Sequence, residues 1–225
     1  MNSATMTKRR AIITVDNPAS VHAEAYRTLR TNVQWSSIES PLRTLLVTSA
    51  EQGAGKSTTA VNLAASFALM GKKTVIVDAD MRRPSQHCYF NKSNRTGLSN
   101  LLKGQFTLSQ TIQDTHIEGL SLLPSGTPPH NPAELLATQR MDEVLEELKQ
   151  EYEFVLLDTT PVLAVTDAQV LGAKVDGVLF VLQCRSTKRD MAKKAIGQLE
   201  YMKSNVIGTV LNRIKKMKYS YRYEL

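Results

Sequence analysis

Short apolar segments alternate along the chain with longer segments of helical periodicity. Six apolar segments predict buried strands, at residues 44–49, 73–78, 120–123, 154–158, 178–182 and 206–211. None of them places a polar residue at every second position, which is the pattern of strands covered by helices on both faces. The alternation therefore predicts an α/β fold with a mostly parallel β-sheet flanked by helices on both faces.

The helical segments carry recognisable ends. Residues 57–70 predict a helix that stops at Gly71, a residue that readily terminates helices. Asn131 and Pro132 predict the start of a second helix, with asparagine as the cap and proline at the first helical position. Apolar residues recur at helical spacing over 188–203 and predict a third.

The net charge of +7 is concentrated at the two ends of the chain. Residues 1–10 hold three basic side chains and no acid, and residues 213–225 have a net charge of +4. The body between them carries 20 basic and 20 acidic side chains. A nucleic-acid-binding protein usually has its excess positive charge on the fold itself, so we expect no nucleic-acid partner.

Cysteine use and hydropathy point to the cytosol. Cys88 and Cys184 are far apart and have no metal-ligand spacing around them, which argues against a disulfide framework or a zinc site. No apolar segment approaches the roughly 18 residues that a bilayer-spanning helix needs. The N-terminus lacks the hydrophobic core of a signal peptide. We therefore expect a soluble, cytoplasmic chain.

A phosphate-binding loop follows the first predicted strand. The segment AEQGAGKS at residues 50–57 has the Walker A pattern between a strand and a helix, although Ala50 stands where the motif has glycine. Glycines let backbone N–H groups turn towards phosphate oxygens, the lysine can contact the β and γ phosphates, and the serine hydroxyl can bind Mg²⁺. The predicted nucleotide-binding residues are Gly53, Ala54, Gly55, Lys56, Ser57 and Thr58.

Three aspartates end apolar strands and are candidates for the same site. Asp158 ends the segment FVLLD, which is the Walker B pattern, and Asp78 and Asp80 follow the strand at 73–78. Carboxylates at the C-terminal ends of parallel strands face the crevice where ligands bind. A single aspartate at a strand end is about as often a turn or cap residue, but three beside a P-loop favour metal ligands and a base. We expect them to make the cleft acidic.

These motifs together resemble the bacterial tyrosine autokinases, or BY-kinases, of capsule and exopolysaccharide operons. The resemblance rests on GAGKST, on VIVDADMRRP at 75–84 and on FVLLDTTP at 154–161. It implies a P-loop NTPase fold of the deviant Walker type that uses ATP and Mg²⁺ to phosphorylate tyrosines. It further implies a role in biofilm-matrix synthesis. A separate transmembrane activator would hold the kinase at the inner face of the cell membrane.

The motifs suggest a role for each site residue. Lys56 and the loop amides hold the phosphates, and Ser57, Asp80 and Asp158 bind Mg²⁺. Asp78 is the candidate that orients or deprotonates the incoming tyrosine, although its division of roles with Asp80 is open.

Asn212 and Arg213 end the last predicted strand. An asparagine at this point often reads adenine in P-loop proteins of this type, because its amide both donates and accepts hydrogen bonds. A strand-terminating turn residue is an equally good interpretation.

Two appendages flank a predicted kinase core at 43–212. In the arm at 1–42, Glu24, Arg27 and Arg30 recur every three residues on one helix face, a spacing also found on ordinary solvated helices. The family's ExxRxxR pattern favours pairing with a neighbouring subunit and a ring-like homo-oligomer.

The tail at 213–225 holds Tyr219, Tyr221 and Tyr223. We expect it to be flexible and to offer these tyrosines to a neighbouring active site. An edge strand, or a basic and aromatic tail for membranes or nucleic acids, is the alternative.

Partition and septum-positioning ATPases share the deviant Walker pattern and are the main rival class. They carry a lysine at the second position of the loop, where this chain has Glu51. A carboxylate cannot neutralise a neighbour's phosphates, so the sequence favours the kinase. A nucleotide-gated scaffold with little catalysis is the third alternative.

Overall fold

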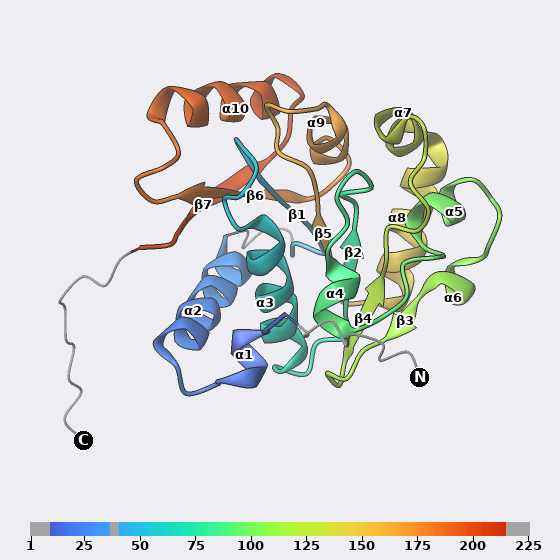
Figure 1. Ribbon diagram of the computed structural model, residues 1–225, viewed down its shortest axis with the longest axis horizontal. Coiled ribbons are helices and arrows are strands. Elements are labelled where there is room, and N and C mark those ends of the chain that lie inside the picture. The colour runs from blue at the N-terminus through green and yellow to red at the C-terminus, as the bar shows by residue number, and fades with distance from the viewer. Residues whose placement is uncertain (1–9, 37–40, 215–225) are drawn as a thin grey trace, which may run out of the picture.

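The computed structural model describes residues 10–36 and 41–214. Within these ranges one seven-stranded sheet runs through the molecule in the order β3-β4-β2-β5-β1-β6-β7 (Figure 1). All neighbouring strands are parallel except β3, which runs antiparallel to β4. The strands are β1 (Thr44–Ser49), β2 (Thr74–Asp78), β3 (Gln113–Asp114), β4 (Leu120–Leu123), β5 (Phe154–Asp158), β6 (Gly177–Gln183) and β7 (Val206–Asn212).

Helices cover both faces of the sheet, as the apolar strands predict. One face carries α1 (Ile13–Asp16), α2 (Val21–Trp35), α3 (Lys56–Ala68) and α4 (Gln86–Phe90). The other carries α5 (Leu98–Leu102), α6 (Leu108–Thr111), α7 (Pro132–Ala137), α8 (Gln139–Glu151), α9 (Asp167–Gly172) and α10 (Arg189–Tyr201). Within the described ranges, no helix is both long and apolar enough to span a bilayer.

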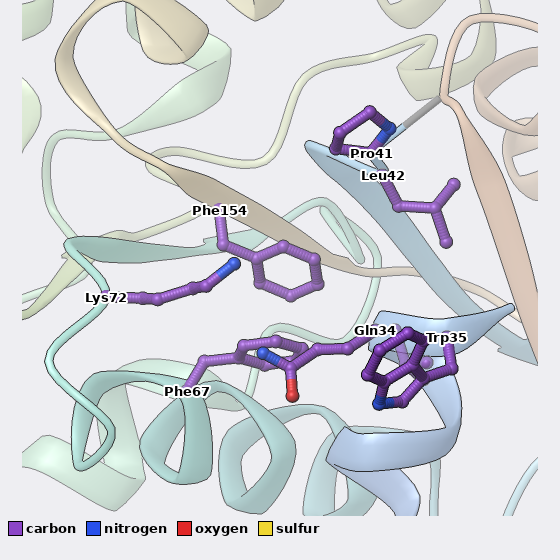
Figure 2. A pocket seen from close by; sticks show the side chains of 8 residues that line it. Gln34, Trp35, Pro41, Leu42, Phe67, Lys72 and Phe154 are labelled. Carbon is purple, nitrogen blue, oxygen red and sulfur yellow. The ribbon is translucent and has the colours of Figure 1, made fainter. Parts of the chain in front are cut away.

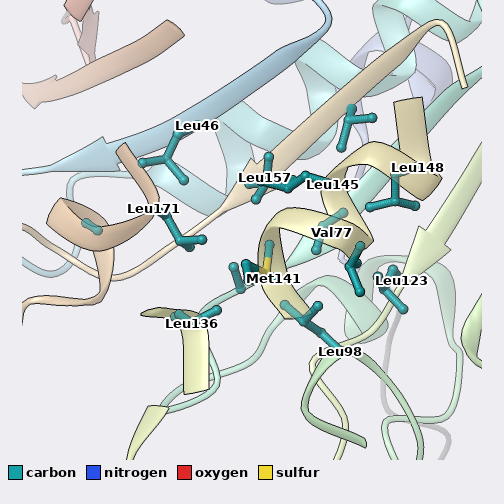
Figure 3. Close-up of a cluster of buried hydrophobic side chains, with 14 of the residues drawn as sticks. Leu46, Val77, Leu98, Leu123, Leu136, Met141, Leu145, Leu148, Leu157 and Leu171 are labelled. Carbon is teal, nitrogen blue, oxygen red and sulfur yellow. The ribbon is translucent and has the colours of Figure 1, made fainter. Parts of the chain in front are cut away.

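Two hydrophobic cores form because successive strand residues point to opposite faces. Leu46 and Leu157 belong to the core beneath α5, α8 and α9, and Leu45 and Leu156 belong to the core beneath α3. Figure 3 shows the first core, in which side chains of α8 such as Leu145 meet the central strands. A strand that is buried on both faces does not alternate polar with apolar residues, which explains why these segments are continuously apolar.

The predicted fold class is confirmed, with small differences at the element ends. All six predicted strands are present, whereas β3 has only two residues and was not predicted. The predicted helices at 57–70 and 188–203 are α3 and α10, whose ends differ by one or two residues. Asn131 does precede α7, but its side chain accepts no hydrogen bond from the helix backbone, and its Nδ2 donates to Glu134 Oε2 at 3.1 Å.

Candidate active site

The carboxyl ends of the central strands meet at one edge of the sheet. The register sets Asp78 of β2 directly opposite Asp158 of β5, and Asp158 opposite Val47 near the end of β1. The P-loop leaves β1 at the same edge. A cleft of about 570 Å³ lies here, lined by the loop, by residues after β2 and β5, and by the end of β7.

The P-loop adopts its shape because two glycines take left-handed backbone angles. Gly53 has φ of 86° and Gly55 has φ of 97°, values that side chains make costly. Helix α3 begins immediately after Gly55, so the N–H groups of its first turn have no acceptor within the helix. Lys56 and Ser57 both line the cleft. These donors and the positive end of the helix dipole form an anion site.

Residues at the ends of β6 and β7 hold the P-loop in place. Asn212 donates from Nδ2 to the carbonyl of Ala54 at 2.9 Å, and its Oδ1 accepts from the N–H of Arg213 at 2.8 Å. With its amide oriented to suit both neighbours, Gln183 donates to the carbonyl of Gly53 at 3.2 Å and accepts from Arg213 at 3.3 Å. The amide of Asn212 is thus engaged with the loop itself in this structure. No sequence pattern indicated Gln183 as part of the site.

The three aspartates occupy different depths. Asp78 and Asp158 are fully buried, whereas Asp80 is 9% exposed and is the only one of the three that lines the cleft. Oδ2 of Asp78 accepts from the backbone N–H groups of Ser85 and Gln86, both at 2.8 Å. Oδ2 of Asp158 accepts from Nε2 of Gln86 at 2.8 Å. Oδ1 of Asp78 and of Asp158 has no hydrogen-bond partner among the described residues.

Burial sets the protonation of the two deep carboxyls. Loss of water raises the pKa of Asp158 to about 6, although the Ser57 hydroxyl, the Lys56 ammonium and the Gln86 amide act in the opposite direction. Burial also raises the pKa of Asp78 well above its usual range, and the charge of Asp158 adds to this increase. These deep groups therefore hold protons more readily than exposed carboxyls do.

The donor set fits a magnesium ion that is shared with a bound phosphate. Among the described residues, no three His, Cys, Asp or Glu side chains gather as a complete metal cage. Ser57 and Asp80 reach the cleft, and Asp158 lies behind them with an unpartnered buried oxygen. Mg²⁺ usually takes one or two protein oxygens and completes its shell with water and phosphate, so this incomplete set suits it.

The cleft is basic, and the expectation of an acidic cleft is wrong. Its lining contains one carboxylate, Asp80, and five cationic side chains: Arg10, Lys56, Arg82, Arg83 and Arg213. The expectation failed because two of the three predicted carboxylates are buried beneath the lining. Such a surface suits a polyphosphate.

Arg82 is held in place by a third fully buried carboxylate, Asp167 at the start of α9. Nε and Nη2 of the arginine bond to the two carboxylate oxygens at 2.9 and 3.0 Å. Asp167 has no exposed surface, while the Arg82 side chain remains 41% exposed. The pair therefore fixes a guanidinium at the cleft. Sequence patterns indicated neither Asp167 nor Arg10 as part of the site.

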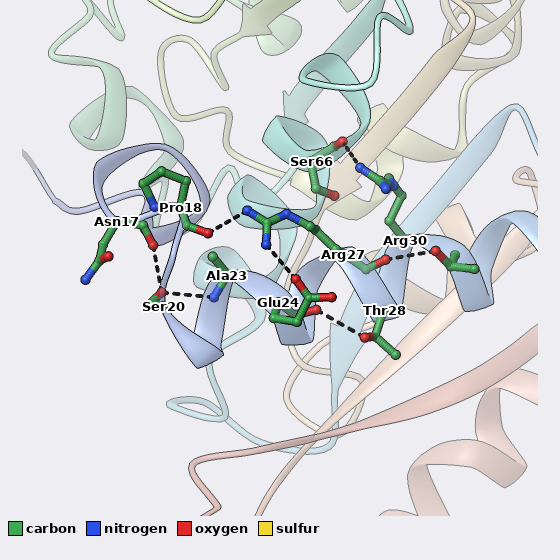
Figure 4. Close-up of polar contacts among 10 residues, drawn as sticks. Asn17, Pro18, Ser20, Ala23, Glu24, Arg27, Thr28, Arg30 and Ser66 are labelled. Atoms are coloured by element: carbon green, nitrogen blue, oxygen red, sulfur yellow. Dashed lines mark hydrogen bonds and ion pairs between the residues drawn. The ribbon is translucent and has the colours of Figure 1, made fainter. Parts of the chain in front are cut away.

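The residues of the predicted oligomerisation motif divide between two surfaces (Figure 4). Arg27 forms an ion pair with Glu24 at 2.6 Å and also donates to the carbonyl of Pro18. Arg30 turns towards α3, where it donates to the carbonyl of Ser66 at 2.9 Å. The side chains of Glu24 and Arg27 thus face solvent together. The side chain of Arg30 faces α3. The predicted phosphorylation sites Tyr219, Tyr221 and Tyr223 lie outside the described residues.

A second hollow lies outside this site, near the amino ends of β1 and β5 (Figure 2). It measures about 290 Å³ and is lined by Trp35, Leu42, Phe67, Phe154 and neighbouring residues. The rings of Phe67 and Phe154 stack with centroids 4.0 Å apart. No predicted site residue lines this hollow, in keeping with the rule that parallel sheets bind ligands at their carboxyl ends.

Comparison with known proteins identifies the family. The AAA domain family matches residues 42–216. The chain is 40% identical to the tyrosine-protein kinase YwqD of Bacillus subtilis, over 94% of this chain and 90% of that protein. It is 38% identical to the putative tyrosine-protein kinase CapB of Staphylococcus aureus, over 92% of both. The chain belongs to the bacterial tyrosine kinases.

A solved structure agrees with this assignment. The kinase domain of Escherichia coli tyrosine kinase ETK superposes with a TM-score of 0.89 at 35% identity, covering 96% of this chain and 86% of that one. The predicted P-loop fold, the BY-kinase family and the enzyme class are thereby confirmed.

Because Asn212 lies close to the P-loop, alanine substitutions at the two glycines of the loop should differ in their effect on nucleotide binding. A Cβ atom on Gly55 would lie 2.0 Å from Nδ2 of Asn212, whereas one on Gly53 would meet nothing within 4 Å. We expect Gly55→Ala to weaken Mg-ADP binding more than tenfold. Gly53→Ala carries only the strain of a left-handed alanine, about 1 kcal/mol. Titration with a fluorescent ADP would measure both, and equal losses would show that Asn212 does not hold the loop.

The raised pKa of Asp158 predicts a pH-dependent stability. Between the ordinary value of 3.8 and about 6, Asp158 holds a proton in the folded nucleotide-free protein that it loses in the unfolded chain. The free energy of unfolding should therefore fall as the pH rises through this window. Asp158→Asn should make this dependence shallower, with the part due to buried Asp78 remaining, and should stabilise the protein at pH 7.5 by roughly 1–3 kcal/mol.

Urea unfolding at pH 4.5 and 7.5 would measure this effect. Asp114→Asn, a change at an exposed carboxylate on β3, is the matched control and should leave the pH dependence as in the wild type. A pH dependence in Asp158→Asn as steep as that of the wild type would contradict the assignment.

Proposed function

We propose that this kinase transfers the γ-phosphoryl group of ATP to tyrosine hydroxyls, first of all to those in the tail of a neighbouring copy. The observation that carries the proposal is the P-loop at the start of α3, which opens into a basic cleft with one carboxylate at its surface. Phosphoryl transfer requires mainly positioned donors and neutralised charge. The five cationic side chains and the loop amides supply both.

Each group has a role that follows from its position. The first-turn amides of α3 and Lys56 bind the phosphates, and Ser57 and Asp80 hold Mg²⁺ in the cleft with the charge of Asp158 behind them. The metal would draw charge from the bridging phosphate oxygens. The adenine would lie towards Asn212 and Arg213, where the P-loop and the end of β7 meet.

The contact with the tyrosine hydroxyl is best assigned to Asp80. Asp78, the sequence-based candidate, lies beneath the lining and is held by two backbone N–H groups. Its raised pKa suits a group that holds a proton below the site. Asp80 is the carboxylate that a substrate in the cleft can touch in this structure.

A ring of subunits would allow phosphoryl transfer from one copy to the next. Glu24 and Arg27 are accessible on α2, and we propose that they contact the next subunit of a ring. Tyr219, Tyr221 and Tyr223 would then reach a neighbour's cleft. The basic tail would be attracted to the negative charge of bound Mg-ATP and not to the basic lining itself. Each phosphate adds nearly two negative charges, so full modification would reverse the sign of the tail, remove this attraction and loosen the ring.

The cellular role is a further part of the proposal. The resemblance of the three sequence motifs to BY-kinases of capsule and exopolysaccharide operons favours regulation of capsule or exopolysaccharide synthesis, and hence of the biofilm matrix. We propose that a separate transmembrane activator holds the kinase at the inner face of the cell membrane and stimulates it. Other tyrosine-containing proteins would be secondary substrates.

A partition-type ATPase and a nucleotide-gated scaffold are the alternatives. Glu51 is exposed beside the P-loop, where the partition class needs a lysine that reaches a partner's phosphates. A carboxylate there would repel them.

The kinase reaction predicts stepwise mass gains. Dephosphorylated protein incubated with Mg-ATP, with a peptide of the activator added if basal turnover is low, should gain one to three phosphates. Peptide mapping should place them on Tyr219, Tyr221 and Tyr223, and Lys56→Met should gain none, because it removes the cation that neutralises the transferred group. Steady ATP hydrolysis without protein phosphorylation would favour the partition class, and binding without turnover would favour the scaffold.

The ring predicts a dependence on Glu24 and Arg27. Light scattering should show an oligomer for dephosphorylated wild type and a smaller species for Glu24→Lys, which reverses the charge at this exposed position. Lys92→Glu, at an exposed site on the α4 side, is the control and should assemble normally. An unchanged size for Glu24→Lys would contradict the proposed interface. Equal sizes for phosphorylated and dephosphorylated wild type would contradict the release step.

A further inference from the structure

The N-terminal arm lies against one face of α3, the helix whose first turn forms the phosphate site (Figure 1). Thr58, Asn62 and Ser66 are four residues apart on α3 and therefore share that face. Ile12 of the arm is fully buried in the core that α3 also enters. The arm is thus packed along the helix that binds the nucleotide.

Asn62 joins the arm to the first turn of α3. Its Oδ1 accepts from the backbone N–H of Thr14 at 3.1 Å and from the Thr14 hydroxyl at 3.3 Å. Its Nδ2 donates to the carbonyl of Thr58 at 2.9 Å. Asn62 has no exposed surface, so a partner that moves away leaves a buried polar group unsatisfied. One amide therefore holds both the arm and the turn that carries the phosphate-binding N–H groups.

A second contact joins the arm to the same turn from the cleft side. The hydroxyls of Thr58 and Tyr89 are 2.9 Å apart, and the guanidinium of Arg10 lies over the Tyr89 ring at 5.6 Å from its centre. All three residues line the cleft. Two independent paths thus connect the arm with Thr58, one through Asn62 and one through Tyr89.

The arm is also fixed at the far end of α3. Arg30 of α2 donates to the carbonyl of Ser66 at 2.9 Å, about one turn beyond Asn62 on the same face of α3 (Figure 4). The same helix α2 presents Glu24 and Arg27 to solvent. A shift of α2 along α3 would therefore change the contacts at Ser66 and, through the continuous arm, those at Asn62.

We propose that Asn62 is a positioning residue that couples the N-terminal arm to the phosphate-binding turn. This inference rests on the proposed nucleotide-binding function. Nucleotide binding orders the first turn of α3, this turn fixes the amide of Asn62, and the amide fixes Thr14 and the arm. Coupling of binding energies is reciprocal, so an ordered arm must raise nucleotide affinity by the same factor.

A merely structural Asn62 makes a different prediction. Its loss would lower stability, but bound nucleotide would have no effect on the arm. Hydrogen exchange at residues 11–16 separates the two cases, because these amides lie in the arm and do not line the cleft.

The experiment uses the full chain with Mg-ADP as the probe. In the wild type, Mg-ADP should slow amide exchange at residues 11–16, including Thr14. Asn62→Ala should bind Mg-ADP roughly tenfold more weakly and should show no nucleotide-dependent protection of the arm. Thr14→Val removes only the hydroxyl contact with Asn62. It should lower both the Mg-ADP affinity and the protection of the arm, each by less than Asn62→Ala does. It replaces Asn62→Ala in the experiment if that variant does not fold.

Ser66→Ala is the matched control on the same face of α3. The Ser66 hydroxyl bonds to the carbonyl of Leu63 within the helix, and Arg30 contacts only the Ser66 backbone, so affinity and arm protection should stay as in the wild type. Wild-type binding of Mg-ADP without arm protection would overturn the coupling alone. Absence of Mg-ADP binding by the wild type would overturn the proposed function, and the coupling with it.

Discussion

The parallel register that sets Asp78 opposite Asp158 is the constraint on which the site depends. Two carboxyls buried side by side lose their water and repel each other when both are ionised. The surroundings offset this cost with donors: the backbone N–H groups of Ser85 and Gln86 turn towards Asp78, and the Gln86 side chain donates to Asp158. The start of α4 is therefore shaped by the need to satisfy these carboxyls.

The burial of Asp78 and Asp158 also decides the sign of the charge on the cleft surface. Because the deep carboxyls lie beneath the lining, the surface that a nucleotide meets is dominated by cationic side chains. Arg82 is anchored by buried Asp167, so its guanidinium is directed without losing its access to the cleft. A basic surface above a layer of carboxyls suits a polyphosphate that brings its own metal ion.

Helix α3 links this chemistry to the rest of the chain. Its start forms the proposed phosphate site, one face carries the arm, and its apolar residues fill the core beneath the sheet. A helix moves largely as a rigid unit, so contacts along its length and contacts at its first turn cannot change independently. For this reason the proposed assembly through α2 and the proposed nucleotide binding at the P-loop would be coupled without direct contact between the two sites.

The sequence alone determined the elements with strong local patterns. The continuous apolar segments 44–49 and 154–158 predicted central strands, and the glycines of the P-loop predicted an anion site, because a burial pattern and a backbone angle are local properties. Only the tertiary structure decided the depth of Asp78 and Asp158, the sign of the cleft and the contacts of Arg10, Asn62 and Asp167. These depend on which distant segments pack together, and the spacing of residues along a chain carries no measure of that distance.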